Sequence, residues 1–122
     1  PLANRFYRRY QRGAKVNRQH QVWVGKESEQ IICSLCLQPV ADGYWLTSLL
    51  VDPARRHRGY ANALLTAIRH HYTGPIWLFC SPSLVPLYTG AGFDLACDLP
   101  ESLADRLLRY QRHKELVPLV SC

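Results

Sequence analysis

The segment that decides the fold runs from Leu49 to Leu65 and reads LLVDPARRHRGYANALL. An apolar run ends at Asp52 and Pro53, and a basic loop with one glycine separates it from a run of small and apolar residues. Aspartate and proline are typical of strand ends and turns, whereas alanine and leucine at helical spacing favour a helix. The segment therefore predicts a strand, a basic loop and a helix in that order.

Three apolar runs separated by polar turns lead up to that loop and predict an antiparallel meander. A basic amphipathic helix is expected before them, because aromatic residues recur among arginines at helical spacing. The expected elements are the helix Leu2–Gln11 and the strands Val22–Val24, Ile31–Val40 and Tyr44–Val51, with turns at Lys26–Glu29 and at Asp42 and Gly43.

Downstream of the loop, helical and apolar segments alternate between prolines and glycines. The expected elements are a helix from Tyr60 to about Tyr72, a doubly buried strand Ile76–Cys80, a short helix Leu84–Tyr88, a strand Phe93–Cys97, a helix Glu101–Lys114 and a strand Val117–Val120. Together they predict an α/β (α+β) single domain over residues 1–122, with a mixed, mostly antiparallel sheet flanked by helices. The crossover helix leaves the basic loop at the carboxyl end of a strand, where open sheets bind ligands.

Composition narrows the class of protein further. The chain has 122 residues, of which 48% are hydrophobic and 20% charged, as in a soluble globular domain. Its apolar runs are too short to cross a bilayer and no export signal is recognisable, so we expect a cytoplasmic protein with no membrane partner. Five cysteines, an odd number in apolar stretches, indicate buried thiols. The formal net charge of +6 favours anionic partners.

The basic loop has the features of an anion site. Gly59 lets the backbone approach a ligand, and Ala61 and Ala63 keep the first helical turn free of bulk. Free backbone amides at the helix start attract negative charge, and the loop arginines add to that attraction. The alternative is a solvated basic loop that caps an ordinary helix.

This loop resembles the cofactor motif of the GNAT acetyltransferase superfamily. In that motif arginine or glutamine, two residues, glycine, one residue and glycine or alanine follow a Val-x-Pro strand end, and here it reads Arg56–Ala61 after residues 51–53. A second stretch, Ser81–Phe93, is similar to the family's downstream signature, a Leu-Tyr pair on a short helix followed by Gly-Phe. The resemblance covers most of the chain from about Leu2 onward.

The resemblance implies an N-acetyltransferase that uses acetyl-CoA as co-substrate, needs no metal and acts on an amine acceptor of unidentified kind. The family holds the CoA pyrophosphate on amides of this loop and the pantetheine arm on the preceding strand. Carried over, the cofactor-binding residues are Leu49, Leu50, Val51, Arg56, His57, Arg58, Gly59, Tyr60, Ala61, Asn62 and Ser81, the serine standing where the family has asparagine. Family members usually open with a further strand, which this chain is expected to lack, and a homodimer is left open.

Tyr88 is the candidate catalytic residue, because the tyrosine of the family's second signature commonly faces the thiol of CoA. Acyl transfer to an amine expels a thiolate that benefits from a proton, and a phenol with a reference pKa of ~10 can donate one. The alternative is a tyrosine that only packs its ring and bonds a carbonyl. For the general base, ordered water is preferred to Glu27, Glu29 or Asp42, which are expected to be solvated turn residues.

Two other classes of function stay open at this point. A small nucleic-acid-binding module would explain arginines interleaved with aromatic residues near Tyr7 and Tyr110, although nucleic acid is the less favoured partner. A catalytically silent protein that binds acetyl-CoA and regulates another would keep the fold and lose the chemistry. Cys33 and Cys36 are expected on opposite faces of a strand, which argues against a metal or redox pair.

Overall fold

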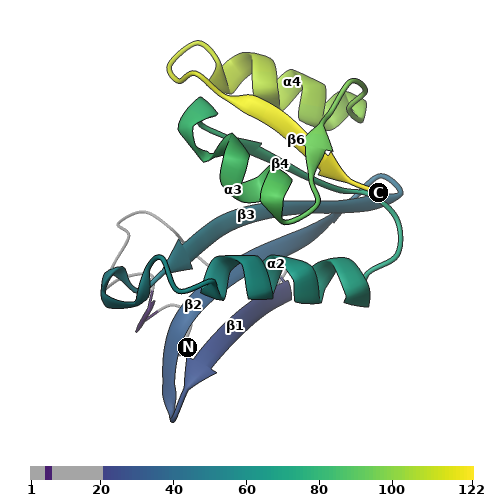
Figure 1. Cartoon of the computed structure of the whole chain (residues 1–122). Helices are drawn as coiled ribbons and strands as arrows, with labels where there is room; N and C mark the ends of the chain where they lie inside the picture. Colours follow the sequence, from purple (N-terminus) through teal and green to yellow (C-terminus); the bar gives the residue numbers. More distant parts are fainter. Residues whose placement is uncertain (1–4, 7–20) are drawn as a thin grey trace.

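A six-stranded sheet forms the centre of the molecule. In the computed structural model of the chain, residues 5–6 and 21–122 are described. The strands are β1 (Gln21–Glu27), β2 (Gln30–Val40), β3 (Gly43–Val51), β4 (Ile76–Cys80), β5 (Asp94–Leu95) and β6 (Val117–Ser121), in the order β1-β2-β3-β4-β6-β5 (Figure 1). Only β3 and β4 pair in parallel, so the expected mixed, mostly antiparallel sheet is confirmed.

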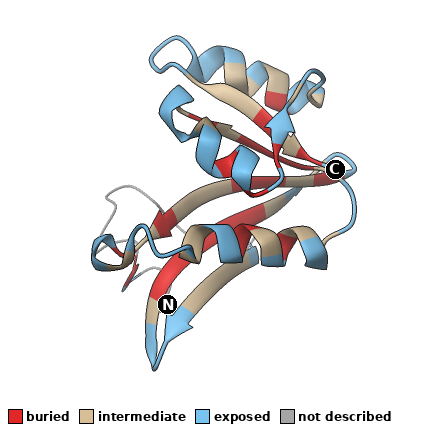
Figure 2. Cartoon of the chain, in the orientation of Figure 1, coloured by how far each residue is buried: buried red, intermediate tan, exposed pale blue. Residues whose placement is uncertain are grey.

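Within residues 21–122, three helices flank this sheet. They are α2 (Tyr60–His71), α3 (Val85–Gly90) and α4 (Glu101–Tyr110), and two short 3-10 turns, η1 (Pro53–Arg55) and η2 (Pro82–Leu84), precede α2 and α3. The apolar stripe of α2, formed by Leu64, Leu65 and Ile68, lies buried against the sheet, while its outer side is exposed (Figure 2). None of the helices in the described ranges is long and apolar enough to span a bilayer.

Strand β4 divides the two hydrophobic layers. Ile76, Leu78 and Cys80 belong to the main core with α2 and α3, whereas Trp77 and Phe79 pack in a second cluster with Leu103 of α4. Successive side chains of a strand point to opposite faces, so α4 covers the face opposite to α2 and α3. Full burial of each such side chain stabilises the fold by about 1.5–3 kcal/mol. The expectation of a strand buried on both faces is confirmed.

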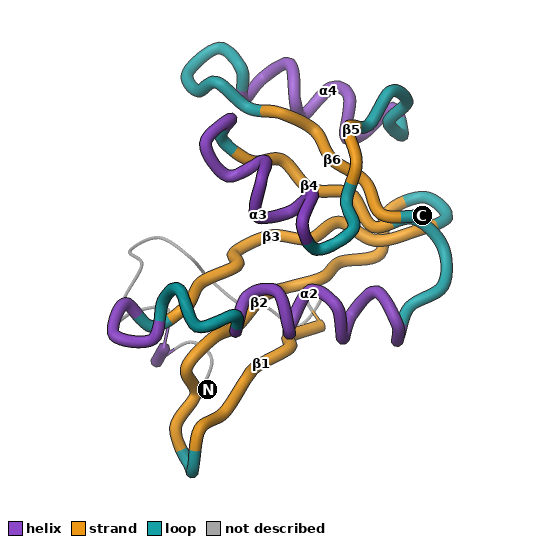
Figure 3. Tube along the Cα trace, viewed as in Figure 1, coloured by secondary structure: helices purple, strands orange, loops and turns teal. Residues whose placement is uncertain are grey.

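Strands β3 and β4 part soon after they begin. Their register contains only Tyr44 opposite Ile76 and Trp45 opposite Trp77, and within these fully described strands no later pair follows. Figure 3 shows the two strands diverging beyond that point. On its other side β3 carries a bulge, because Cys36 pairs with Thr47 but Ser34 pairs with Leu50. Ser48 takes up the extra residue with a φ of 61°, and such bulges bend the strand.

Several expected boundaries were wrong, and local chemistry explains them. The strand expected over Phe93–Cys97 is only Asp94–Leu95, because Pro118 would be the next partner on β6 and has no N–H to donate. The short helix begins as a 3-10 turn and continues past Tyr88 to Gly90.

The last helix also ends earlier than expected. It stops at Tyr110, after which the backbone forms turns and the Gln111 side chain donates to the Leu116 carbonyl at 3.1 Å. Two cysteines were wrongly expected to be buried, because Cys97 and Cys122 are exposed. Cys33 and Cys36 are buried in different clusters on the two faces of β2, as expected. The helix expected over Leu2–Gln11 lies outside the described residues apart from residues 5 and 6.

Candidate functional site

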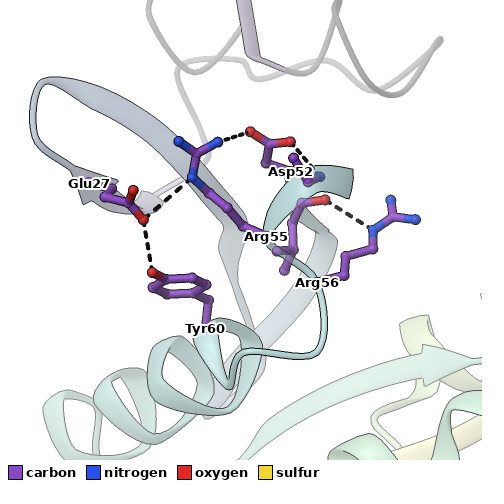
Figure 4. A network of polar contacts seen from close by, with 7 residues as sticks. Glu27, Asp52, Arg55, Arg56 and Tyr60 are labelled. Atoms are coloured by element: carbon purple, nitrogen blue, oxygen red, sulfur yellow. Dashed lines mark hydrogen bonds and ion pairs between the residues drawn. The ribbon is translucent and has the colours of Figure 1, made fainter.

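The loop between β3 and α2 is fixed by a chain of polar contacts. Asp52 caps η1, since its Oδ1 accepts from the Ala54 amide at 2.9 Å, and its Oδ2 accepts from Arg55 Nη1 at 2.7 Å. Arg55 Nε also donates to Glu27 Oε2 at 3.4 Å, and the Tyr60 hydroxyl donates to that same oxygen at 2.9 Å (Figure 4). The network therefore links the end of β1 to both ends of the loop.

The hydrogen bonds of this network also shift its titrations. The pKa of Glu27 is lowered, first by the hydrogen bond from Tyr60 and then by Arg55, and the hydrogen bond to Glu27 raises the pKa of Tyr60. Glu27 stays ionised and Tyr60 stays protonated at neutral pH. Because Arg55 faces two carboxylates, its charge is largely compensated, whereas the Arg56 guanidinium donates to the Val51 carbonyl at 3.3 Å.

The start of α2 presents open backbone amides. Gly59 occupies the cap position with a φ of 85°, and no side chain caps the helix. An added Cβ at Gly59 would meet no atom within 4 Å, so the space beside this backbone is open. His57 also has a positive φ, 65°, which is strained for a residue with a side chain. Uncapped amides with positive helix-dipole character favour an anion at this place.

A pocket of about 510 Å³ connects that helix start with α3 and the diverging end of β3. We call it the loop pocket, and its volume is in the range of small-molecule sites. Its apolar wall includes Leu84 and Leu87, which are 44% and 36% exposed. The loop pocket is lined by Leu49, Leu50, Val51, Arg55, Arg56, His57, Gly59, Tyr60, Ala61, Asn62, Leu84, Leu87 and Tyr88.

Tyr88 lines this pocket from α3, and its place there is firmly held. Only 6% of the residue is exposed, its ring meets that of Phe93 edge to face at 6.0 Å, and its carbonyl accepts from two amides in the turn after α3. Burial raises the pKa of Tyr88 to about 12, and the neighbouring Cys80 thiol adds to the rise. The phenol is therefore protonated throughout the neutral range.

Comparison with known proteins assigns the family. The family model described as acetyltransferase (GNAT) domain matches residues 18–95. The chain belongs to the GNAT acetyltransferase family. No curated protein matches this GNAT chain by sequence.

Solved structures share the GNAT fold of the chain at low identity. The ribosomal-protein-S18-alanine N-acetyltransferase from Escherichia coli has a TM-score of 0.69 at 15% identity, over 99% of this chain and 85% of that one. GCN5 from Tetrahymena has a TM-score of 0.66 at 16% identity, over 84% and 68% of the two chains. A GNAT family acetyltransferase from Elizabethkingia anophelis with acetyl-CoA bound has a TM-score of 0.66 at 13% identity, over 84% and 76%.

Most residues expected to hold the cofactor of this GNAT domain lie together in the loop pocket. Arg58 and Ser81 are the exceptions, because neither lines it, and Ser81 instead shares a hydrogen bond with Ser83 at 3.1 Å. The structure adds Arg55, Leu84 and Leu87 to the lining. The two leucines lie three residues apart, Leu84 at the end of η2 and Leu87 on α3, and this spacing is the signal that could have found them.

The acidic residues near the GNAT domain's meander give no candidate base at the loop pocket. Glu27 is held by Tyr60 and Arg55, and Glu29 and Asp42 are exposed in turns, as expected. None of these three carboxylates lines the loop pocket. Within residues 5–6 and 21–122, no group of three or more His, Cys, Asp and Glu side chains is arranged for a metal ion.

Proposed function

We propose that the chain transfers the acetyl group of acetyl-CoA directly to a primary amine. The observation that supports this most is the loop pocket itself. It joins an uncapped helix start, an apolar wall and a protonated tyrosine at the point where β3 and β4 part. A nucleotide thioester has the same sequence of chemistry along its length: charged phosphates, a largely apolar arm and a reactive sulfur.

The residues of the loop pocket fit this co-substrate. The amides from Gly59 to Asn62 and the cationic side chain of Arg56 suit the pyrophosphate, since the cap of α2 is open. The exposed side chains of Leu84, at the end of η2, and Leu87, on α3, suit the pantetheine arm. Among the described residues, the register of β3 with β4 ends at Trp45, and the backbone of β3 near Leu49 is the proposed partner for the amides of the arm.

Acetyl-CoA supplies an activated acyl group, so no protein nucleophile is needed. Tyr88 lines the loop pocket and is the proposed donor of a hydrogen bond to the leaving sulfur, where negative charge develops. Its raised pKa keeps the proton available, although it also makes the phenol a weaker acid than a solvated one. Burial raises the pKa of a thiol as well, so the difference between the pKa of the Tyr88 phenol and that of the leaving thiol is smaller. A water molecule is the proposed proton acceptor for the incoming amine.

The test of this role is the Tyr88→Phe variant, which removes one oxygen and keeps the ring that packs on Phe93. Turnover, measured as thiol release with a panel of amines, should fall by ~10²-fold to ~10⁴-fold, the usual range for a general acid. The dissociation constant of acetyl-CoA, measured by calorimetry, should change little. Tyr44→Phe is the matched control, because Tyr44 lies outside the loop pocket. Full turnover in Tyr88→Phe would remove the acid role.

Two alternatives give different results in the same experiments. A regulatory protein would bind acetyl-CoA and acetylate none of the amines tested. A nucleic-acid module would fail to bind acetyl-CoA at millimolar concentration and would bind single-stranded RNA with a steep dependence on salt. The loop pocket favours an acetyl-CoA-binding chain over a nucleic-acid module, and turnover with an amine separates the acetyltransferase from the regulatory protein.

A further inference from the structure

A second pocket opens on the face of the sheet that α4 covers. We call it the α4 pocket, and its volume is about 460 Å³. Its residues come from β3, from β4 and from the segment that follows α4. It is lined by Trp45, Leu46, Thr47, Ser48, Phe79, Tyr110, His113, Lys114 and Leu116.

The two pockets lie on opposite faces of the sheet and meet along the same strand. The loop pocket takes residues 49–51 of β3 and the α4 pocket takes residues 45–48. Residues 46–51 of this stretch follow the last pairing with β4, at Trp45 and Trp77. A ligand in the α4 pocket therefore reaches the opening between the strands from the side opposite to Tyr88. That is the side from which an acceptor can approach the reacting carbon without displacing the co-substrate.

Aromatic rings form one wall of the α4 pocket. Trp45 and Phe79 have ring centroids 5.9 Å apart, and Phe79 meets Tyr110 edge to face at 6.4 Å. The guanidinium carbon of Arg106 lies 4.3 Å from the centroid of the Trp45 ring, so a cation already occupies that aromatic surface. The wall suits an apolar or aromatic body of a ligand and offers less to a second cation.

The charge of the α4 pocket is positive. Lys114 brings a full positive charge and His113 a titratable one, and no aspartate or glutamate is among the described residues that line it. Glu115 lines a neighbouring hollow that shares His113, Lys114 and Leu116 with the α4 pocket. The indole N–H of Trp45 is buried without an acceptor in the described part of the chain, so ligand oxygens are better matched to this wall than further donors.

The positive charge of the α4 pocket also affects the protonation of an amine bound there. An amine must be neutral to attack a thioester, and nearby positive charge with no carboxylate lowers the pKa of a bound ammonium group. A pocket of this kind favours deprotonation of the acceptor to solvent. It disfavours acceptors that carry several ammonium groups, because each would add repulsion from Lys114.

We propose that the α4 pocket binds the acceptor, and that the acceptor is an amine with an apolar or aromatic body and a carboxylate that pairs with Lys114. This inference rests on the proposed function, whose acetyl donor occupies the other face. Amines of the amino-acid type are accepted, whereas polyamines and other polycations are rejected.

Direct binding to the full chain tests this without requiring turnover. L-phenylalanine, phenethylamine and spermidine are titrated by calorimetry with and without CoA, since the first two differ only by the carboxylate. L-phenylalanine should bind at least ~3-fold to ~10-fold more tightly than phenethylamine, the range expected for a partly exposed ion pair. Spermidine should bind more weakly still. Equal or tighter binding of phenethylamine or spermidine, or no saturable binding of L-phenylalanine, overturns the proposal.

A variant pair locates the site. Lys114→Gln should weaken L-phenylalanine by the same ~3-fold to ~10-fold and leave phenethylamine unchanged. Lys26→Gln makes the same change on exposed β1, far in the sequence from the pocket lining, and should alter neither. An equal effect of both variants would place the carboxylate elsewhere. If acetyl-CoA fails to bind while L-phenylalanine binding depends on Lys114, the proposed donor is wrong and the α4 pocket stands as a site in its own right.

Discussion

At the scale of single residues, the burial of Tyr88 has a measurable effect on stability. Its pKa is about 12 in the folded chain and near 10 when solvated, so the folded state holds this proton more tightly. That contribution is fully present below pH 10 and is lost as the pH rises to 12, and two pKa units correspond to about 3 kcal/mol. Urea unfolding at pH 9 and pH 11.5 should show a steeper fall for the native chain than for Tyr88→Phe. Parallel losses in the two proteins would mean that the hydroxyl is solvated.

A substitution at Gly59 gives a second prediction, because the φ of 85° affects stability and the open space beside the residue affects ligand binding. Gly59→Ala should cost about 1–2 kcal/mol in backbone strain and, in addition, should weaken acetyl-CoA at least ~10-fold by placing a methyl group where the phosphates approach. Gly74→Ala is the control, since Gly74 has a φ of 89° and lies outside the loop pocket. Gly74→Ala should lose at least as much stability, because its added Cβ lies 3.0 Å from the Asp42 carbonyl oxygen, and it should keep its affinity. Denaturant unfolding and calorimetry measure the two quantities.

At the scale of secondary-structure elements, Arg69 joins three of them. Its Nε donates to Ser121 Oγ of β6 at 2.6 Å, and its Nη1 donates to the Ala91 carbonyl after α3 at 2.9 Å. Its guanidinium also fills the space beside Gly92, where an added Cβ would lie 2.2 Å from Nη1. Ser121 and Ala91 are both buried, so these bonds hold α2, α3 and β6 in one arrangement.

Arg69→Met tests that junction, because methionine retains an apolar stem and removes both hydrogen bonds. It leaves two buried polar groups without partners, so the free energy of unfolding should fall by about 2–4 kcal/mol. Arg109→Met, an exposed position on α4, should change it by less than about 0.5 kcal/mol. Chemical unfolding with both variants decides the matter, and equal small losses would show that solvent replaces the Arg69 contacts.

The elements that the sequence predicted well are those with a local signal. Ile76–Cys80 has a proline on either side at short range, and the observed strand has the expected bounds. The bulge of β3 could not be predicted, because it is placed at Ser48 and no glycine marks its positive φ. The parting of β3 from β4 depends on the packing of both sheet faces, and therefore on residues distant in the chain.

The residues of the candidate site also divide into those with a local signal in the sequence and those without one. The motif from Arg56 to Ala61 is contiguous, so its residues were recognisable together, and apart from Arg58 they line one pocket. The α4 pocket was not recognisable, because it combines elements separated by many residues. At Ser81 the chain departs from the family motif, which has asparagine there. This serine does not line the loop pocket. Its assignment to the cofactor stays a prediction that the pocket does not support.

At the scale of the whole molecule, the sheet separates the two pockets. The face with α2 and α3 carries the loop pocket, and the face with α4 carries the α4 pocket. The formal net charge of +6 suits both proposed ligands, since a thioester of a phosphorylated nucleotide and an amine with a carboxylate are each drawn to positive surface. Long-range attraction of this kind is screened by salt, whereas the contacts within each pocket are screened less.

Ligand-induced stabilisation of the whole chain follows from that arrangement. Acetyl-CoA binds only the folded state in this proposal, so at 100 times its dissociation constant it should add about 2.7 kcal/mol to the free energy of unfolding. For a domain of this size the melting temperature should rise by on the order of 10 °C. Raising the salt concentration should weaken affinity, and Arg56→Ala should reduce both the affinity and its salt dependence, because one phosphate-facing charge is removed. Adenosine without phosphates is the ligand control and should give a shift of less than about 1 °C. A thermal shift equal for acetyl-CoA and adenosine, or one insensitive to salt, would contradict the assignment of the phosphates to the start of α2.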